Sequence, residues 1–232
     1  MTEKIHGVMI TGKDAQHEKL ARLSVKSFLA QTYSNKKLLI INDGAYSLSD
    51  LNCDEVKEIR VENSDGKIKL GGLRNVAFEY LNDGDIWVQW DDDDYRHPNL
   101  IQLQYDFLLS KKIDYCFLKS QILYDFNINH ARIQYRPHGI IGTVMHRYDG
   151  KTKYDNISRA EDKLFKAHKG YSLDLSPFHY CRFLHKSNTW GFTHFYKTRR
   201  RRQVIKNFSN KWNIDGDSKK YLEQVLKYYS KD

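Results

Sequence analysis

The sequence predicts an α/β fold with a single, Rossmann-like, mostly parallel sheet that is flanked by helices. Three observations support this prediction. Strand and helix signals alternate through the first half of the chain, which is typical of parallel strands joined by crossover helices. The strand segments are short and apolar on both faces, as in strands covered by helices on each side. A chain of 232 residues with 40% hydrophobic content is long enough to bury a large core.

Local patterns place the elements of the first half in order. Helices are expected over residues 18–31, where apolar residues recur at helical spacing, from the Gly71-Gly72 pair to residue 80, and from Pro98 onward, because proline favours the first helical turn. The apolar segments that predict strands are 6–10, 37–42, 56–61 and 85–90. The second of these stops at Asp43-Gly44, a turn signal.

The second half is less regular. Strands are expected over residues 113–118 and 139–146, a short helix over 159–168, and an amphipathic helix over 221–229 at the C-terminus. The chain contains no internal repeat and no low-complexity linker, so we expect one continuous domain rather than two independent ones.

Charge and cysteine content limit the class of protein. The net charge is +9, and Arg199, Arg200, Arg201 and Arg202 form a basic run near the C-terminus. This run either binds a polyanion, such as nucleic acid, an anionic lipid surface or an acidic glycan, or it is a solvated basic face. The three cysteines form no Cys-x-x-Cys pair, which argues against zinc and disulfides and suits the cytoplasm. No apolar run approaches the ~20 residues that span a bilayer, and no signal peptide is expected, although peripheral membrane contact stays open.

Residues 91–94 are four consecutive aspartates that directly follow an apolar strand. Like charges repel, so folding by itself does not favour this arrangement, whereas a hard cation such as Mg²⁺ or Mn²⁺ would remove the penalty. The alternative is a solvated acidic turn that caps the helix near Pro98. The ends of two other strands, Thr11-Gly12 and Asp43-Gly44, are expected on the same edge of the sheet, where ligands bind in parallel folds. This convergence favours the metal site.

Seven segments carry a family resemblance through their order and spacing. They are Val8-Met-Ile-Thr-Gly, Ser27-Phe-Leu-Ala-Gln-Thr-Tyr-Ser, Leu39-Ile-Ile-Asn-Asp-Gly, Gly72-Leu-Arg-Asn-Val-Ala, Asp91-Asp-Asp-Asp-Tyr-Arg-His-Pro, Gly142-Thr-Val-Met-His-Arg and Ala160-Glu-Asp-Lys-Leu. Together they resemble the inverting GT-A glycosyltransferases of family 2, from about residue 5 to 190. The resemblance implies a GT-A fold in which residues 1–98 form the nucleotide-sugar-binding half and residues 99–232 the acceptor-binding half.

The resemblance also implies roles on the donor side. Thr11 would line the donor site, Asp43 would contact the nucleotide base, and Asp91 or Asp92 would contact the ribose. Asp93 would be the main ligand of a divalent metal, Mn²⁺ or Mg²⁺, which neutralises the departing diphosphate. A structural alternative for Asp43 is a turn that ends its strand. Asp94 would do no more than cap the next helix.

Further roles concern catalysis and the phosphates. Asp162 would be the base that takes the proton of the acceptor hydroxyl, with Glu161 as the alternative base. An exposed helix carboxylate is the structural alternative for Asp162. Arg74, at a helix start, either holds a phosphate or the base, or pairs locally. Attack on the anomeric carbon in a single displacement inverts its configuration.

The chain departs from part of the family. The Gln-x-x-Arg-Trp motif of processive polysaccharide synthases is absent, as are their membrane helices, which predicts transfer of one sugar. The segment from Tyr180 to Trp190 resembles a His-x-x-Asn-Thr segment of some small members. His185 would complete the metal site or touch the diphosphate, unless it is a structural histidine, and Asn188 and Trp190 would contact donor or acceptor.

The predicted function is metal-dependent, non-processive transfer of a sugar from a nucleotide diphosphate sugar, with uridine diphosphate as the favoured carrier. The acceptor would be a glycan, a lipid-linked molecule or a nucleic acid. Two alternatives stay open: glycosylation of hydroxymethylated phage-type DNA, with the target base flipped out of the duplex, and a non-catalytic polyanion-binding module with a decayed site. The sequence does not name the sugar, because a few pocket contacts decide donor specificity.

Overall fold

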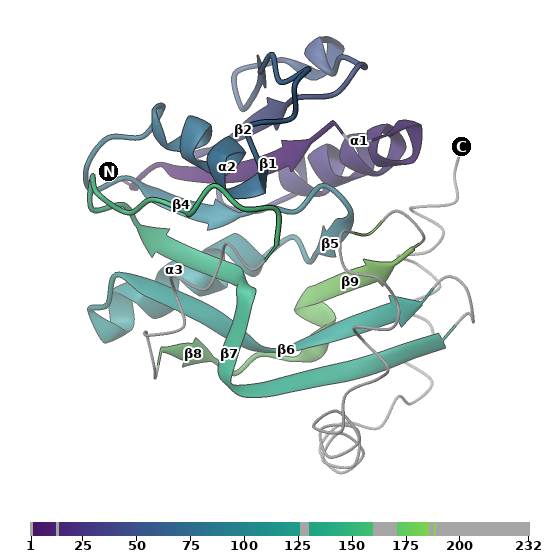
Figure 1. Cartoon of the computed structure of the whole chain (residues 1–232). Coiled ribbons are helices and arrows are strands. Elements are labelled where there is room, and N and C mark those ends of the chain that lie inside the picture. Colours follow the sequence, from purple (N-terminus) through teal and green to yellow (C-terminus); the bar gives the residue numbers. More distant parts are fainter. Residues whose placement is uncertain (1, 13, 126–129, 160–170, 186–187, 189–232) are drawn as a thin grey trace.

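The computed structural model describes residues 2–12, 14–125, 130–159, 171–185 and 188. The expected helices over residues 159–168 and 221–229 lie almost entirely outside the described residues, as does the arginine run. Within the described part, one nine-stranded sheet extends through both halves of the chain (Figure 1).

The first half forms the parallel part of this sheet. Strands β1 (Ile5–Thr11), β2 (Lys36–Asn42), β3 (Val56–Arg60) and β4 (Ile86–Gln89) lie in the order β3-β2-β1-β4 and run parallel. All four expected strands are confirmed, with ends that differ by a residue or so. Their carboxyl ends share one edge, and Thr11 is paired with Asn42 there.

The second half adds strands of both directions. Strand β7 (His130–Arg147) is antiparallel to β4 and to β6 (Tyr115–Asp125), and β6 runs parallel to both β8 (Ser172–Leu173) and β9 (Tyr180–Leu184). The expected strands at 113–118 and 139–146 are found but are much longer, because they form a hairpin that extends beyond the parallel part (Figure 1). Strand β5 (Asp94–Arg96), which pairs with β9, was not expected.

Helices cover both faces of the parallel strands. Helix α1 (Ala15–Leu29) and helix α3 (Leu100–Lys111) pack on one face, and helix α2 (Leu70–Phe78) packs on the other. Alternate strand residues point to opposite faces, so Leu38 and Ile40 contact the first layer, whereas Leu39 and Ile41 contact the second. This arrangement explains why the strands are apolar on both faces.

The helix starts are set by local signals. Asp14 caps α1, because its side chain accepts a hydrogen bond from the His17 backbone N–H at 2.9 Å. Helix α3 begins at Leu100, so Pro98 precedes the helix instead of occupying its first turn as expected, and Asn99 in the capping position makes no side-chain cap hydrogen bond. The part of the chain that the structure describes also contains the 3₁₀ turns η1 (Ser49–Leu51), between β2 and β3, and η3 (Pro177–His179), before β9.

Two glycines bring the ends of β1 and β2 into close contact. Gly12 has a φ of +133°, and a Cβ atom on Gly44 would lie 2.0 Å from the Gly12 carbonyl oxygen. A side chain at either position would push the two loops apart. The fold therefore requires glycine at both strand ends on this edge.

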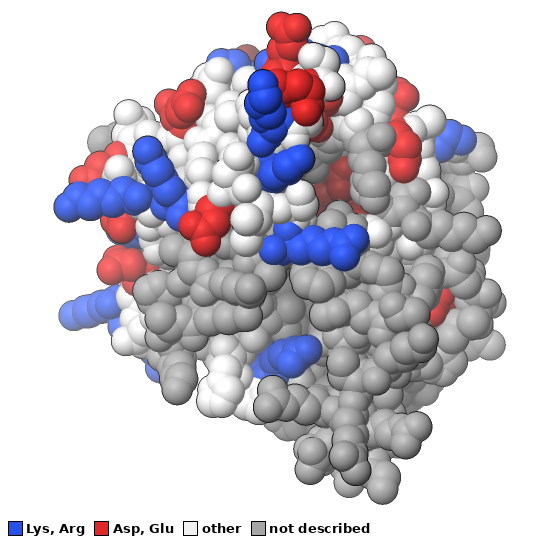
Figure 2. Space-filling model, in the orientation of Figure 1, with Lys and Arg blue, Asp and Glu red and all other residues white. Residues whose placement is uncertain are grey.

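On the face of the molecule that Figure 2 shows, the described lysine and arginine side chains are mixed with those of aspartate and glutamate. No large patch of one charge is present among the described residues of this face. Among the helices of the described part of the chain, none is long and apolar enough to cross a membrane.

Candidate active site

The carboxyl edge of the parallel strands brings the predicted donor residues together. The Thr11 hydroxyl at the end of β1 donates a hydrogen bond to Asp92 Oδ2 at 2.7 Å, although 81 residues separate them. Asp43 follows β2, and the aspartates follow β4, on this same edge. The convergence expected from strand order is therefore present in the structure.

Each aspartate of the cluster has its own set of partners. Asp91 accepts hydrogen bonds from Gln89 Nε2 at 3.0 Å and from Arg74 Nη2 at 3.4 Å. Asp92 is buried, and besides Thr11 it contacts His17 Nδ1 at 3.0 Å. Arg74 is thus paired with a cluster residue, which is consistent with the local-pairing alternative and also places its charge at the site.

Asp93 faces a second histidine. Its Oδ2 atom lies 3.0 Å from His185 Nε2 and accepts a hydrogen bond from Asn188 Nδ2 at 2.9 Å. The rings of His17 and His185 meet edge to face with centroids 5.4 Å apart, so the Asp92 and Asp93 pairs are adjacent. His185 therefore belongs to the site, next to the aspartate predicted to hold the metal.

Asp94 differs from the prediction that it would cap the next helix. It lies on β5, is fully buried, and accepts hydrogen bonds from the Tyr180 hydroxyl and the Phe183 backbone N–H. The capping position of α3 is occupied by Asn99. The prediction was wrong because β5 and β9 pair, which turns the Asp94 side chain into the interior.

The buried carboxyls of Asp92, Asp93 and Asp94 differ in the direction in which their pKa is shifted. Burial raises the pKa of Asp92, although the hydrogen bond from His17 works against this rise. Burial also acts to raise the pKa of Asp93, but the hydrogen bond and charge of His185, with the charge of Arg182, outweigh burial and leave the pKa lowered. Burial and the charge of Asp93 hold the pKa of Asp94 well above its usual range. Asp93 is thus the one of these three that most favours the ionised form.

The donor atoms at Asp93 fit a hard divalent ion in part. Among the described residues, no three His, Cys, Asp or Glu side chains are grouped closely enough to hold a metal ion by themselves. Asp93 and His185 supply a carboxylate oxygen and an imidazole nitrogen. Mg²⁺ is usually bound through one or two carboxylates and completes its shell with substrate phosphates and water, so this pair would be sufficient only with the donor bound.

The surroundings of Asp43 and Thr11 contain residues that the sequence reasoning missed. Asn63 Nδ2 donates to Asp43 Oδ2 at 2.9 Å and to the Ile68 carbonyl at 2.8 Å, so it fixes Asp43 against the loop that leads to α2. The Tyr46 hydroxyl lies 2.7 Å from Thr11 Oγ1, and burial raises the pKa of Tyr46 to about 12. The signal available for Asn63 was its position just after the third expected strand, on the same edge. His17 and Tyr46 carried no comparable signal.

Other predicted residues lie outside the described part of the chain. These are Glu161, Asp162, Trp190, Arg199, Arg200, Arg201 and Arg202, whose roles stay predictions. Within the described part, Arg147 is structural, since its guanidinium donates to Glu3 Oε1 and to the Gly84 carbonyl, away from the cluster.

Sequence comparison relates the chain to glycosyltransferases. No protein-family model matches it. It is similar to glycosyltransferase GlyA of Streptococcus pneumoniae serotype 4, at 25% identity over 121 residues, which are 48% of this chain and 17% of GlyA. It is also similar to UDP-Glc:alpha-D-GlcNAc-diphosphoundecaprenol beta-1,3-glucosyltransferase WfgD of Escherichia coli, at 26% identity over 132 residues, which are 53% of this chain and 48% of WfgD. The chain spans less than half the length of the curated relatives it matches.

Structural comparison relates the fold to S. aureus TarS. TarS 1–349 in complex with UDP-GlcNAc matches with a TM-score of 0.62 and 16% identity, covering 97% of this chain and 72% of that chain. The complex of TarS 1–349 with UDP matches with a TM-score of 0.60 and 18% identity, covering 78% of this chain and 60% of that chain. The expected α/β fold of GT-A type is confirmed by this likeness. The relatives in sequence are glycosyltransferases, which is consistent with an enzyme.

Proposed function

We propose that this protein is a metal-dependent, non-processive inverting glycosyltransferase of the GT-A family 2 type, which moves one sugar from a nucleotide diphosphate sugar to an acceptor hydroxyl. The observation that carries the proposal is the meeting of Thr11, Asp43 and Asp91–Asp93 on one edge of the sheet. The likeness in fold to TarS in complex with UDP-GlcNAc supports a uridine diphosphate donor.

The donor would lie along this edge from base to phosphates. Asp43, held by Asn63, would accept a hydrogen bond from the base, and Asp91 or Asp92 would bind the ribose. Arg74 is buried beside Asp91, and its charge there would also attract the diphosphate. These assignments follow the order of the strand ends along the edge.

Asp93 and His185 would hold the divalent metal, which supplies Lewis-acid stabilisation of the charge on the departing diphosphate. The lowered pKa of Asp93 suits this role, since a carboxylate must be ionised to bind a metal. Asn188 would keep Asp93 oriented, because it is anchored on the Phe183 carbonyl at 3.2 Å. Asp162, with Glu161 as the alternative, would take the proton of the attacking hydroxyl.

The acceptor would be a glycan or a lipid-linked molecule, bound by the second half with Trp190 and the basic tract. The name of WfgD specifies a diphosphoundecaprenol-linked acceptor, which favours this class over hydroxymethylated DNA. A decayed polyanion-binding module is disfavoured by the polar partners that the aspartates at the sheet edge retain.

A donor screen tests the proposal. Release of nucleoside diphosphate would be followed with Mn²⁺ or Mg²⁺ across common sugar nucleotides, for the wild type and for Asp93→Ala and Asp162→Ala. We expect activity with a uridine diphosphate sugar and loss of transfer in both variants. Asp106→Ala is the matched control, because Asp106 is an exposed carboxylate on α3. Undiminished transfer in both variants would overturn the assignment.

A further inference from the structure

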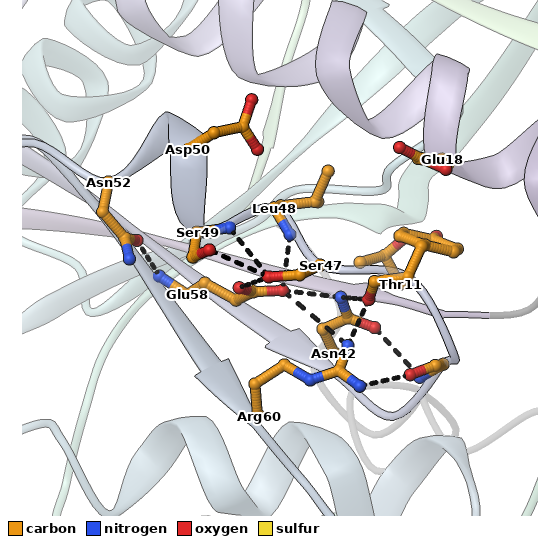
Figure 3. A network of polar contacts seen from close by, with 12 residues as sticks. Thr11, Glu18, Asn42, Ser47, Leu48, Ser49, Asp50, Asn52, Glu58 and Arg60 are labelled. Atoms are coloured by element: carbon orange, nitrogen blue, oxygen red, sulfur yellow. Dashed lines mark hydrogen bonds and ion pairs between the residues drawn. The ribbon is translucent and has the colours of Figure 1, made fainter.

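The segment that follows β2 is fixed by a buried carboxylate on the neighbouring strand. The Glu58 side chain on β3 is only 2% exposed. It accepts hydrogen bonds from Asn42 Nδ2 at 2.7 Å, from the Leu48 backbone N–H at 2.9 Å and from the Ser47 hydroxyl at 3.0 Å (Figure 3). A carboxylate with three donors in a buried position fixes all three groups strongly.

A second charged residue of β3 binds the backbone of the same segment. Arg60 lies two residues after Glu58, on the same face of the strand. Its guanidinium donates to the Gly44 carbonyl at 2.5 Å and to the Tyr46 carbonyl. Asn42 also binds the segment at two points, through Gly44 N at 2.9 Å and the Tyr46 carbonyl at 2.9 Å (Figure 3). Residues 43–48 are therefore held from β2 and from β3 together.

This segment is connected to the acidic cluster through the Thr11 side chain. The Thr11 hydroxyl has one proton, which it donates to Asp92, so the contact between Tyr46 and Thr11 must have Tyr46 as donor. The result is a directed chain from Tyr46 to Thr11 to Asp92. In such a chain each hydrogen bond strengthens the next, and its geometry depends on where the Tyr46 backbone is held.

We propose that Glu58 is a positioning residue of the donor site, which holds residues 43–48 so that Tyr46 supports Asp92 through Thr11. The inference rests on the proposed function, because it assigns Asp92 and Asp43 to the donor. Glu58 itself touches neither base nor phosphate. It acts at a distance by fixing the one segment that carries Asp43 at one end and Tyr46 near the other.

The test is the affinity for UDP, measured by calorimetry with Mn²⁺ for the wild type, Glu58→Gln, Tyr46→Phe and the double variant. Glutamine keeps the size of Glu58 and one acceptor oxygen, but it removes the negative charge and replaces the oxygen that accepts from the Ser47 hydroxyl with an amide N–H₂. We expect the Kd for UDP to rise about tenfold in Glu58→Gln and about fivefold in Tyr46→Phe. The double variant should be close to Glu58→Gln alone, because both changes interrupt the same chain.

Glu55→Gln is the matched control. Glu55 is also acidic and lies directly before β3. Its carboxylate contacts Lys36 Nζ at 3.0 Å, at the opposite end of β2 and away from the site. This variant should lower the melting temperature without changing the Kd for UDP. A purely structural role for Glu58 would give the same pattern as Glu55, with the Kd for UDP unchanged.

The outcomes separate the two proposals. If the wild type binds UDP, and Glu58→Gln binds it as tightly as Glu55→Gln does, the positioning role is wrong while the proposed function stands. If the rise in the Kd for UDP in the double variant equals the product of the rises in the two single variants, the connection through Tyr46 is also wrong. If the wild type binds no nucleoside diphosphate from a panel of UDP, GDP, CDP and ADP, the proposed function itself fails.

Discussion

Asp93 and Asp94 are neighbours in the chain with the same side chain, yet the structure gives them opposite environments. Asp93 points to the sheet edge, where His185 and Asn188 contact it and where its pKa is lowered. Asp94 points into the interior against Tyr180, and its pKa is raised well above the usual range. The difference shows that two adjacent aspartates of one cluster have different roles: Asp93 pairs with polar side chains at the edge of the sheet, and Asp94 accepts hydrogen bonds in the interior behind it.

The largest expected effect comes from Asp93. Asp93→Asn keeps the shape of the side chain but removes the charge that would bind the metal. We expect transfer to fall by about a hundredfold or more, because the charge that develops on the leaving diphosphate loses its counter-ion. Thermal unfolding should change little, since the amide can still bond to its neighbours. If Asp93→Asn lost folded protein to the same extent as activity, the contrast between Asp93 and Asp94 would be contradicted.

A large effect on stability is expected at Asp94. Asp94→Ala would leave the Tyr180 hydroxyl and the Phe183 N–H without their acceptor in a fully buried place. We expect a loss of about 2–4 kcal/mol in the free energy of unfolding, measured by urea denaturation. Asp106→Ala, on the exposed face of α3, is the control and should change stability by less than about 0.5 kcal/mol.

A smaller loss is expected at Arg96, which lies on the same short strand as Asp94. Its guanidinium carbon is 4.3 Å from the ring centre of Trp90 and 4.7 Å from that of Tyr180, and Nη2 donates to the Gln89 carbonyl at 2.6 Å. Arg96→Lys keeps the charge but loses the planar stacking. The free energy of unfolding should fall by about 1–2 kcal/mol, again from urea denaturation. A change in UDP affinity at unchanged stability would instead place β5 in the donor site.

The smallest effect is a change in pH dependence. The folded-state pKa of Asp94 lies above its unfolded value of about 3.9, so its contribution to stability is complete below that pH and is lost as pH rises toward the folded pKa. Asp94→Asn removes this loss, because the amide stays neutral and the Tyr180 hydroxyl can turn to accept from it. The stability of the wild type relative to Asp94→Asn should therefore decline from about pH 4 upward, in urea titrations without added metal. A rise over this range would show that Asp94 is ionised in the fold.

Much of the first half could be predicted from local patterns. The expected strands 37–42 and 56–61 and the helix from the Gly71-Gly72 pair are all present, because each is specified by its own apolar spacing and by turn residues such as Gly44. Elements that depend on long-range pairing were predicted less accurately. Strand β5 has only three residues and no apolar pattern of its own, so it exists through its pairing with β9, about 86 residues away in the chain.

The sequence by itself determined that four aspartates end a buried strand, and that Thr11 and Asp43 end strands on the same edge, because strand direction and alternation are local properties. Only the tertiary structure decided what each aspartate does. The partners that contact them, His17, His185 and Tyr180, come from 75 to 92 residues away in the chain. Repulsion between the aspartates is thus offset by side chains that folding brings into contact with them. A pKa depends on burial and on neighbours in space, which no local pattern contains.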